Sequence, residues 1–270
     1  MNENQPKNPT GIDAYNPAEI AVLVERAGTN KANLPIVQIM ALSVLAGVFI
    51  SLGALFYTLV MTGVDTGYGP ARFLGGIAFS LGLILVIVGG AELFTGNALI
   101  VMAWIDRHIS TMSLLRNWLL VYAGNLAGAL MMVFLAYYAG LLQGELGTTA
   151  VNIAKAKVSL GFYQAFFLGV LCNILVCLAV WLSFAARSVA GKILAIVWPI
   201  SAFVALGLEH SIANMYLMPA GLLAGAPGSL NDVLQNIIPV SLGNIIGGAG
   251  GVAVAYWAAY GRYRRPLGKD

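Results

Sequence analysis

Six long apolar runs, each long enough to cross a lipid bilayer, dominate this sequence. They fall at 36–62, 73–104, 112–141, 158–186, 190–224 and 236–260. A transmembrane helix needs about 20 predominantly apolar residues, and such a run satisfies its own backbone hydrogen bonds in lipid as a helix. Charged residues make up only 9% of the chain, against roughly 25% in soluble proteins. We therefore predict an all-α integral membrane protein with six transmembrane helices.

The second and fifth runs are too long for one straight helix, and both contain polar residues. Gly89-Gly90 and Thr95-Gly96 bracket the polar stretch of the second run, and Gly207 opens that of the fifth. Backbone that leaves the helix at membrane depth is tolerated only where it is buried in protein or lines a water-filled cavity. We therefore predict that helices 2 and 5 are broken inside the protein.

The positions of lysine and arginine predict the orientation. With six spans, all of the 14 basic residues lie on the side of the two termini except Arg72, Lys155 and Lys157. Cytoplasmic loops carry the excess of basic residues in membrane proteins, so we expect a multi-pass protein of the cytoplasmic (inner) membrane with both termini in the cytoplasm. The net charge of +3 reflects this topology, and no nucleic-acid partner is expected.

The polar ends of the chain predict its division into segments. Residues 1–35 are expected to form a cytoplasmic segment, 36–260 the channel domain and 261–270 a basic cytoplasmic tail. Asn16-Pro17-Ala18-Glu19 has the N-cap, N1 and N3 residues of a helix start. Apolar residues follow at helical spacing as far as Gly28. We predict a short amphipathic helix that ends there and lies against the bundle or the lipid surface.

Two motifs occur twice in the chain. Residues 90–97 (GAELFTGN) and 207–214 (GLEHSIAN) share G-x-E-x-x-x-x-N, and 124–128 (GNLAG) and 243–247 (GNIIG) share G-N-x-x-G. The copies are 117 and 119 positions apart, so both pairs agree on one alignment of the halves. Three spans per half is an odd number, so the second half would enter the membrane upside down. We predict a 3+3 inverted repeat whose broken helices meet near the midplane, as in many transporters.

Each break contains a glutamate and an asparagine of the repeated motif. The first turn of a helix exposes N–H groups with partial positive charge, and a nearby carboxylate can accept from them. We predict that Glu92 and Glu209 cap the half-helices and, together with Asn97 and Asn214, support the two break loops.

His210 is a histidine inside an apolar run, whereas the other histidine, His108, lies in a predicted loop. An ionisable residue within the membrane indicates a functional site by default, and imidazole can change its charge near physiological pH. We interpret His210 as a functional residue. Because the two histidines are far apart in the predicted topology, neither a metal site nor a cofactor is expected.

Four stretches resemble signature sequences of the formate/nitrite transporter family. They are 89–97 (GGAELFTGN), 171–181 (LCNILVCLAVW), 207–215 (GLEHSIANM) and 237–248 (IIPVSLGNIIGG). The resemblance covers residues 15–260 in order and spacing. It implies an aquaporin-like six-helix protomer, a homopentamer with one pore per protomer, and passage of small monovalent anions such as formate, nitrite and hydrosulfide.

The resemblance also implies roles for individual residues. The family's pore histidine, break-loop threonine, span-four asparagine and outer-vestibule lysine have counterparts in His210, Thr95, Asn173 and Lys157. Its hydrophobic constrictions fall on Phe79, Leu83, Leu93 and Phe203. The chain departs from the family beside the histidine, where Leu206 replaces a small residue and Leu208 an aromatic one.

The chemistry of these residues agrees with passage of an anion. Lys157 can concentrate anions at the outer face. An ion pays a large desolvation cost in an apolar constriction unless polar groups replace its hydration, and Thr95, Asn173 and the half-helix N–H groups can do so in part. Because a weak acid crosses more easily when neutral, our hypothesis is that His210, directly or through water, helps the anion acquire a proton.

Two other protein classes fit this sequence less well. A water or neutral-solute channel would need paired NPA motifs, whereas the NPA at 16–18 lies in the polar N-terminal segment. A membrane enzyme would need several convergent acids, histidines or a metal set. We therefore predict a pH-dependent channel or transporter for a small monovalent anion. Formate is the preferred substrate because it is widespread among substrates of the family, and hydrosulfide and nitrite are the alternatives.

Overall fold

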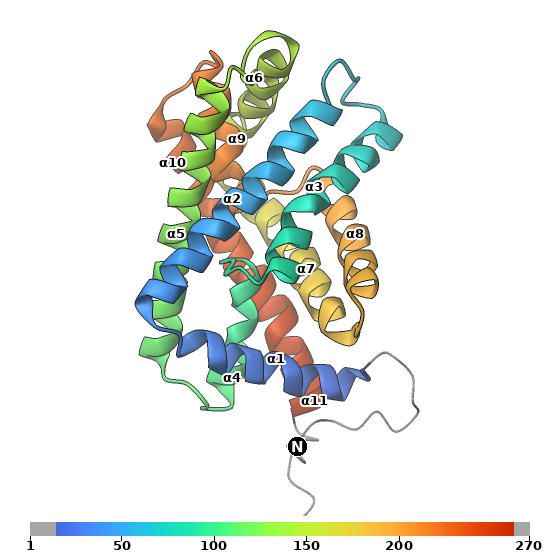
Figure 1. Cartoon of the computed structure of the whole chain (residues 1–270), viewed down its shortest axis with the longest axis vertical. Helices are drawn as coiled ribbons and strands as arrows, with labels where there is room; N and C mark the ends of the chain where they lie inside the picture. The colour runs from blue at the N-terminus through green and yellow to red at the C-terminus, as the bar shows by residue number, and fades with distance from the viewer. Residues whose placement is uncertain (1–14, 262–270) are drawn as a thin grey trace, which may run out of the picture.

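The computed structural model describes residues 15–261, and the regular elements in this part of the chain are helices (Figure 1). Residues 1–14 and nearly all of the predicted basic tail lie outside the described residues. The elements are α1 (Pro17–Ala32), α2 (Ile36–Val60), α3 (Gly69–Gly89), η1 (Gly96–Ile100), α4 (Val101–Ile105), α5 (Thr111–Tyr138), α6 (Gly144–Val158), α7 (Phe162–Ala185), α8 (Val189–Ala205), α9 (Ser211–Leu223), α10 (Leu230–Ile245), η2 (Ile246–Val254) and α11 (Ala255–Tyr260).

Five helical stretches are long and apolar enough to cross a membrane: Ile36–Val60, Gly69–Gly89, Thr111–Tyr138, Phe162–Ala185 and Leu230–Tyr260. The predicted fifth span is divided between α8 and α9, each too short to cross alone. Helix α6, a 15-residue helix between the third and fourth predicted spans, was not predicted.

The first helix begins where the sequence predicts. The side chain of Asn16 accepts from the backbone N–H of Glu19, and the Glu19 carboxylate accepts from the backbone N–H of Asn16, which forms a capping box. The predicted end at Gly28 is wrong, because α1 continues to Ala32. A Cβ atom at Gly28 would lie 3.2 Å from the Cα atom of Ile100, so this glycine allows α1 to pack closely on η1.

Both predicted breaks are present. Helix α3 ends at Gly89, Gly90 takes a positive φ of 80°, and η1 starts at Gly96. Helix α8 ends at Ala205, Gly207 has φ 71°, and α9 starts at Ser211. Glycine adopts this left-handed conformation without the steric cost that a Cβ atom adds. The chain therefore leaves each helix at a residue suited to the turn.

The helices form two groups of similar construction. Helix α2 packs against α3 and α5, α7 packs against α8 and α10, and α3 and α8 join the groups. Glycines set the close approaches in both groups. A Cβ atom at Gly128 would collide with the carbonyl oxygen of Val44 on α2, and one at Gly247 with that of Val170 on α7. Small residues let apolar helices gain packing contacts in a membrane.

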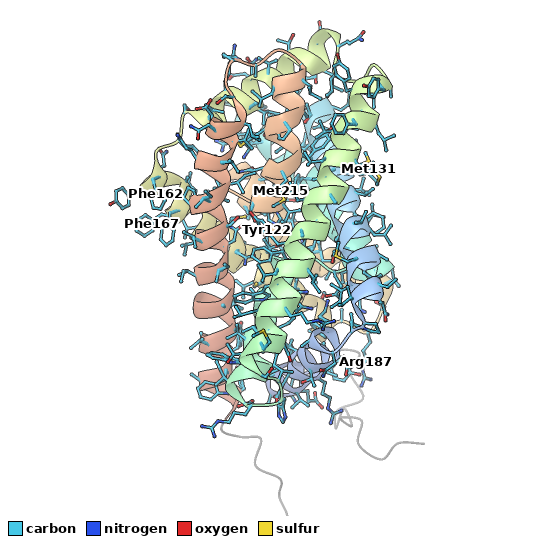
Figure 2. All side chains as sticks on the ribbon, turned by 90° about the vertical axis from the view of Figure 1, so that its left-hand side faces the viewer. Tyr122, Met131, Phe162, Phe167, Arg187 and Met215 are labelled. Carbon is cyan, nitrogen blue, oxygen red and sulfur yellow. The ribbon has the colours of Figure 1, made fainter. Side chains whose placement is uncertain are left out.

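The outer surface carries large apolar side chains. In Figure 2, Phe162, Phe167 and Met131 point away from the bundle, and they are 53%, 61% and 45% exposed. Met215 lies in the interior and is 1% exposed. An apolar exterior of this extent matches a lipid or protein environment and not water.

We expect Gly247→Ala to lower the free energy of unfolding by about 1–3 kcal/mol, the usual cost of overpacking, because its Cβ atom meets the backbone of α7. Gly250→Ala, three residues away in the same helical stretch, is the matched control, since its Cβ atom meets nothing within 4 Å. Thermal unfolding of the two purified variants in detergent measures the difference. Equal melting temperatures would contradict the packing role.

Candidate functional site

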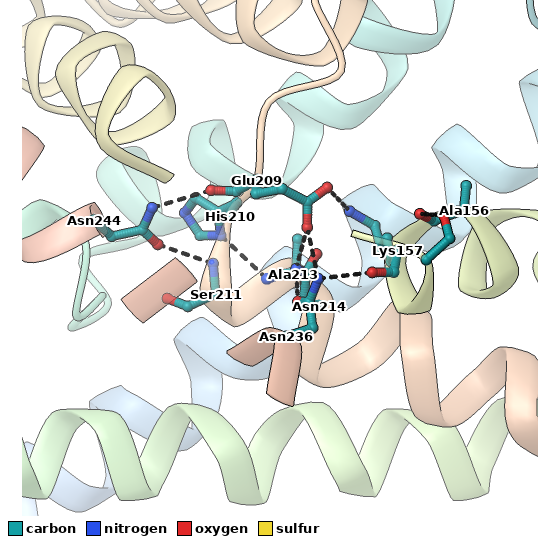
Figure 3. Close-up of polar contacts among 10 residues, drawn as sticks. Ala156, Lys157, Glu209, His210, Ser211, Ala213, Asn214, Asn236 and Asn244 are labelled. Atoms are coloured by element: carbon teal, nitrogen blue, oxygen red, sulfur yellow. Dashed lines mark hydrogen bonds and ion pairs between the residues drawn. The ribbon is translucent and has the colours of Figure 1, made fainter. Parts of the chain in front are cut away.

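The second break loop is held by a cluster around Glu209 (Figure 3). Lys157 Nζ, from the end of α6, lies 2.7 Å from one carboxylate oxygen of Glu209. Asn214 Nδ2 donates to the other oxygen over 2.6 Å and to Asn236 Oδ1 over 2.8 Å. Asn236 Nδ2 donates in turn to the backbone oxygen of Lys157 over 3.0 Å. The cluster therefore ties the loop to α6, α9 and α10.

The first break loop is held by the same set of interactions around Glu92. Lys31 Nζ, from the end of α1, lies 2.6 Å from one carboxylate oxygen of Glu92. Asn97 Nδ2 donates to the other oxygen over 2.8 Å and to Asn117 Oδ1 over 3.0 Å. Asn117 Nδ2 donates to the backbone oxygen of Lys31 over 3.1 Å. Helix α1 thus has the same relation to the first loop that α6 has to the second.

The asparagines of the G-N-x-x-G motifs satisfy the loop backbones. Asn125 Oδ1 accepts from the Phe94 N–H, and its Nδ2 donates to the carbonyl oxygens of Ser43 and Glu92. Asn244 Oδ1 accepts from the Ser211 N–H, and its Nδ2 donates to the carbonyl oxygens of Gly169 and Glu209.

The prediction that the glutamates cap the half-helices is wrong at the level of atoms. The carboxylates of Glu92 and Glu209 bond to a lysine and to asparagine side chains, whereas Asn244 Oδ1 accepts from the first N–H group of α9. An asparagine has both a donor and an acceptor, so it satisfies N–H and C=O groups together. A carboxylate, which only accepts, is better matched to a lysine.

His210 is the N-cap of α9. Its Nδ1 accepts from the backbone N–H of Ala213 over 3.1 Å, and its Nε2 lies 3.0 Å from Thr95 Oγ1 in the other break loop. The imidazole is 2% exposed and stacks on Phe203 with a centroid separation of 6.0 Å. His210 and Thr95, both predicted as pathway residues, are therefore brought together from the two halves of the chain.

Asn173 lies beside this pair in the middle of α7. Its Nδ2 donates to the carbonyl oxygens of Thr95 and Asn244 over 3.2 and 2.6 Å. Its Oδ1 is buried and accepts no hydrogen bond. Asn173 thus links the two break loops and leaves one acceptor unused.

Two cavities reach toward the breaks from opposite ends. The α6-side cavity, of about 730 Å³, is lined by Phe79, Phe203, Leu208, His210, Lys157 and Arg72, among others. The α1-side cavity, of about 320 Å³, is lined by Leu83, Leu93, Glu92, Lys31 and Lys192, among others. The predicted constriction residues are all buried, with Phe79 and Phe203 in edge contact at 5.4 Å. The two phenylalanines line the α6-side cavity, and the two leucines line the α1-side cavity.

The two leucines that depart from the family pattern differ in position. Leu208 is 8% exposed and lines the α6-side cavity, so its side chain affects the shape of that cavity. Leu206 is 65% exposed and is not among the lining residues of either cavity.

Sequence reasoning missed Lys31, Asn117 and Asn236 as members of these clusters. Asn117 and Asn236 are 119 positions apart, the same offset as the G-N-x-x-G motifs, so the repeat alignment contained the signal. Lys31 and Lys157 are 126 positions apart. That offset lies outside the alignment, and Lys31 belongs to a segment interpreted as separate from the channel.

His108 and the acidic residues do not form a metal site in residues 15–261, where no group of three or more potential ligands is close enough to hold a metal ion. His108 Nε2 lies 2.5 Å from a carboxylate oxygen of Glu25 on α1, and neither residue is among those that line the two cavities.

Comparison with known proteins decides the family. The family model described as formate/nitrite transporter matches residues 18–258. The chain belongs to this family. It is 41% identical to the formate channel FocA of Escherichia coli (strain K12), over 92% of this chain and 95% of that protein.

Solved structures agree with the assignment. A structure described as a pentameric formate channel with formate bound is 39% identical, covers 83% of this chain and 97% of its own, and has a TM-score of 0.75. A structure described as an FNT family ion channel is 30% identical, covers 90% and 98%, and has a TM-score of 0.80. This member of the formate/nitrite transporter family is therefore a multi-pass membrane protein, and its relatives are channels and transporters and not enzymes.

Removal of the Asn244 amide tests the support of the second loop. We expect Asn244→Leu to lower the free energy of unfolding by about 3 kcal/mol or more, because three buried backbone groups lose their partner at roughly 1–3 kcal/mol each. Asn231→Leu, at an exposed position in the first turn of α10, is the control. Melting temperatures in detergent compare the two, and an unchanged value for Asn244→Leu would rule out this role.

Proposed function

We propose that the chain is a channel for small monovalent anions, with formate as its principal substrate. The supporting observation is that the α6-side cavity reaches His210, which is bonded to Thr95 of the first break loop, while the α1-side cavity reaches that loop from the other end. The names of the relatives give the substrate, since the similar proteins of known function are described as formate channels. Nitrite and hydrosulfide, which share the charge and small size of formate, are the alternative substrates.

In the proposed pathway, an anion moves from the α6-side cavity past Phe79 and Phe203 to His210. It then passes Leu83 and Leu93 into the α1-side cavity. Thr95 replaces part of its hydration between the constrictions. The Nδ2 group of Asn173 is engaged by the carbonyl oxygens of Thr95 and Asn244, so Asn173 offers the pathway its remaining oxygen. The unused Oδ1 acceptor of Asn173 suits a protonated or hydrogen-bonding substrate more than a bare anion, because a carboxylate offers no proton to it.

The hydrogen bonds of His210 restrict how it assists protonation. The Ala213 N–H can only donate, so Nδ1 accepts, and a neutral imidazole carries its proton on Nε2. From Nε2, that proton points to Thr95 and is available to an anion that displaces the hydroxyl group. Gaining a second proton on Nδ1 costs the cap bond. We therefore propose that His210 holds the anion by donation while a proton arrives directly or through water.

The proposed architecture is a six-span inverted repeat, in which α3 with η1 and α4 forms broken span 2 and α8 with α9 forms broken span 5. The matching clusters around Glu92 and Glu209 support this interpretation. The repeat includes α1 as the counterpart of α6, so we propose that residues 17–32 are part of the channel domain. For the rest of the chain, we propose the segments expected from the sequence, with 36–260 as the six-span region followed by a basic tail.

We also propose that the protein is a homopentamer in the cytoplasmic membrane with both termini in the cytoplasm. The relative described as pentameric and the exposed apolar surface support assembly in a bilayer. One end of the molecule holds helices α1, α4 and α11, and the other end holds α6 (Figure 1). In this orientation, the positive-inside rule places the α1 end in the cytoplasm.

Formate flux tests the proposed function. Proteoliposomes with the full chain should take up radiolabelled formate faster at acidic than at neutral outer pH, because a larger supply of protons neutralises more anion. Protein-free liposomes give the background from free diffusion of formic acid. Nitrite and hydrosulfide as competitors should reduce uptake only weakly. Strong displacement by hydrosulfide would reassign the substrate, and background-level flux of all three anions would reject the function.

The variant His210→Asn separates the imidazole from the helix cap, since asparagine is also a favourable N-cap. We expect formate flux to fall about tenfold to a hundredfold, the loss of one hydrogen bond to a charged group, and to respond less to pH. Flux in proteoliposomes and elution volume in detergent measure function and folding separately. A variant with the flux and pH profile of the original protein would contradict the role of His210.

A further inference from the structure

Each cavity is lined by a second basic residue in addition to its lysine–glutamate pair. Arg72 lines the α6-side cavity and Lys192 lines the α1-side cavity. Each is the fourth residue of its half-helix, α3 or α8. They are 120 positions apart, close to the offsets of the repeated motifs. Nothing in the sequence motifs singled out either residue.

The lysines of the two clusters are electrically compensated. Lys157 is 2.7 Å from Glu209 and Lys31 is 2.6 Å from Glu92. The side chain of Lys157 is only 13% exposed, and that of Glu209 only 5%. Such a pair acts at a distance as a dipole, because the attraction of the lysine for an approaching anion is opposed by the repulsion of the carboxylate. Removing the lysine would leave a buried carboxylate without its partner, which is strongly destabilising.

Arg72 and Lys192 are not compensated in this way. Within residues 15–261, neither forms an ion pair with a carboxylate, and both are half-buried. The Arg72 guanidinium lies over the second break loop, since a Cβ atom at Gly207 would be 2.9 Å from its Nη2. Glu145 also lines this cavity, but it is exposed in the first turn of α6. The positive charge is therefore next to the loop and the negative charge is toward solvent.

We propose that Arg72 and Lys192 are the residues that draw the anion into the two cavities, whereas Lys157 and Lys31 chiefly hold the break loops. This inference rests on the proposed anion transport and adds specificity-determining residues to it. Each cavity is lined by one such cation. A single uncompensated charge in a concave cavity raises the local concentration of a counter-ion.

The test compares formate uptake by full-length variants in proteoliposomes at low and high ionic strength. The double variant Arg72→Gln/Lys192→Gln should raise the half-saturating formate concentration about threefold to tenfold at low salt, the factor for one charge a few ångströms away in a high dielectric. High salt should reduce the difference, because it screens exposed charges. Arg72→Lys/Lys192→Arg should restore the original value.

Three further variants separate charge from folding. Lys155→Gln removes an exposed basic residue near Lys157 that does not line the cavity, and it should leave half-saturation unchanged. Glu145→Gln should lower half-saturation, since it removes a negative charge. Lys157→Gln should lower the melting temperature and the maximal rate together.

The outcomes distinguish the inference from the function. Absence of flux in the unmodified protein would reject the proposed function itself. Normal flux with an unchanged half-saturation in the double variant would overturn only the inference. It would also be overturned if Lys157→Gln shifted half-saturation without a loss of thermal stability.

Discussion

The structure depends on satisfying polar backbone that leaves the helix in an apolar interior. Each break frees N–H and C=O groups that lipid cannot satisfy, and a single asparagine amide meets one N–H and one C=O of the loop and also a carbonyl group of a neighbouring helix. Asn125 does so for the first loop and Asn244 for the second. The closely packed glycine positions beside these asparagines bring α5 against α2 and α10 against α7. Without that proximity, the amides could not reach the backbone of the neighbouring helices.

The second requirement is to bury a carboxylate in each loop. Glu92 and Glu209 are each 4% exposed, and a buried charge is tolerated when it is paired and hydrogen-bonded. The partner in both cases is a lysine at the end of a helix that does not cross the bundle, α1 or α6. These two short helices are therefore bound to the break loops. The N-terminal helix contacts the first loop in the same way that α6 contacts the second.

The proposed function depends on the polar side-chain groups that are not used to hold the break loops. With most polar groups engaged in holding the loops, the imidazole of His210, the hydroxyl of Thr95 and one oxygen of Asn173 remain near the point where the halves meet. The aromatic pair lines the α6-side cavity together with His210, and the leucine pair lines the α1-side cavity. In the proposed pathway, the free oxygen of Asn173, which can only accept a hydrogen bond, favours a substrate that carries a proton.

The elements that depend on local chemistry and on repetition could be predicted from the sequence. Apolar run length predicted membrane helices, Asn16 with Glu19 predicted the start of α1, and the glycines at 89–90 and 207 predicted the breaks. The repeated motifs predicted that two loops would be alike, and the family resemblance assigned both His210 and Thr95 to the substrate pathway. Each of these features is encoded within a few neighbouring residues, so no knowledge of distant contacts was needed.

The hydrogen bonds between side chains that are distant in the chain could not be predicted and emerge from the packing of the helices. The sequence assigned the capping role to glutamates, whereas the N–H groups of Phe94 and Ser211 donate to asparagines 31 and 33 positions away and His210 is the N-cap of α9. It ended α1 at Gly28, whereas that glycine is a contact point for η1. It separated Lys31 from the channel, whereas an ion pair across 61 positions joins them. A donor and an acceptor far apart in the chain meet because helix packing brings them together, and packing is a property of the whole fold.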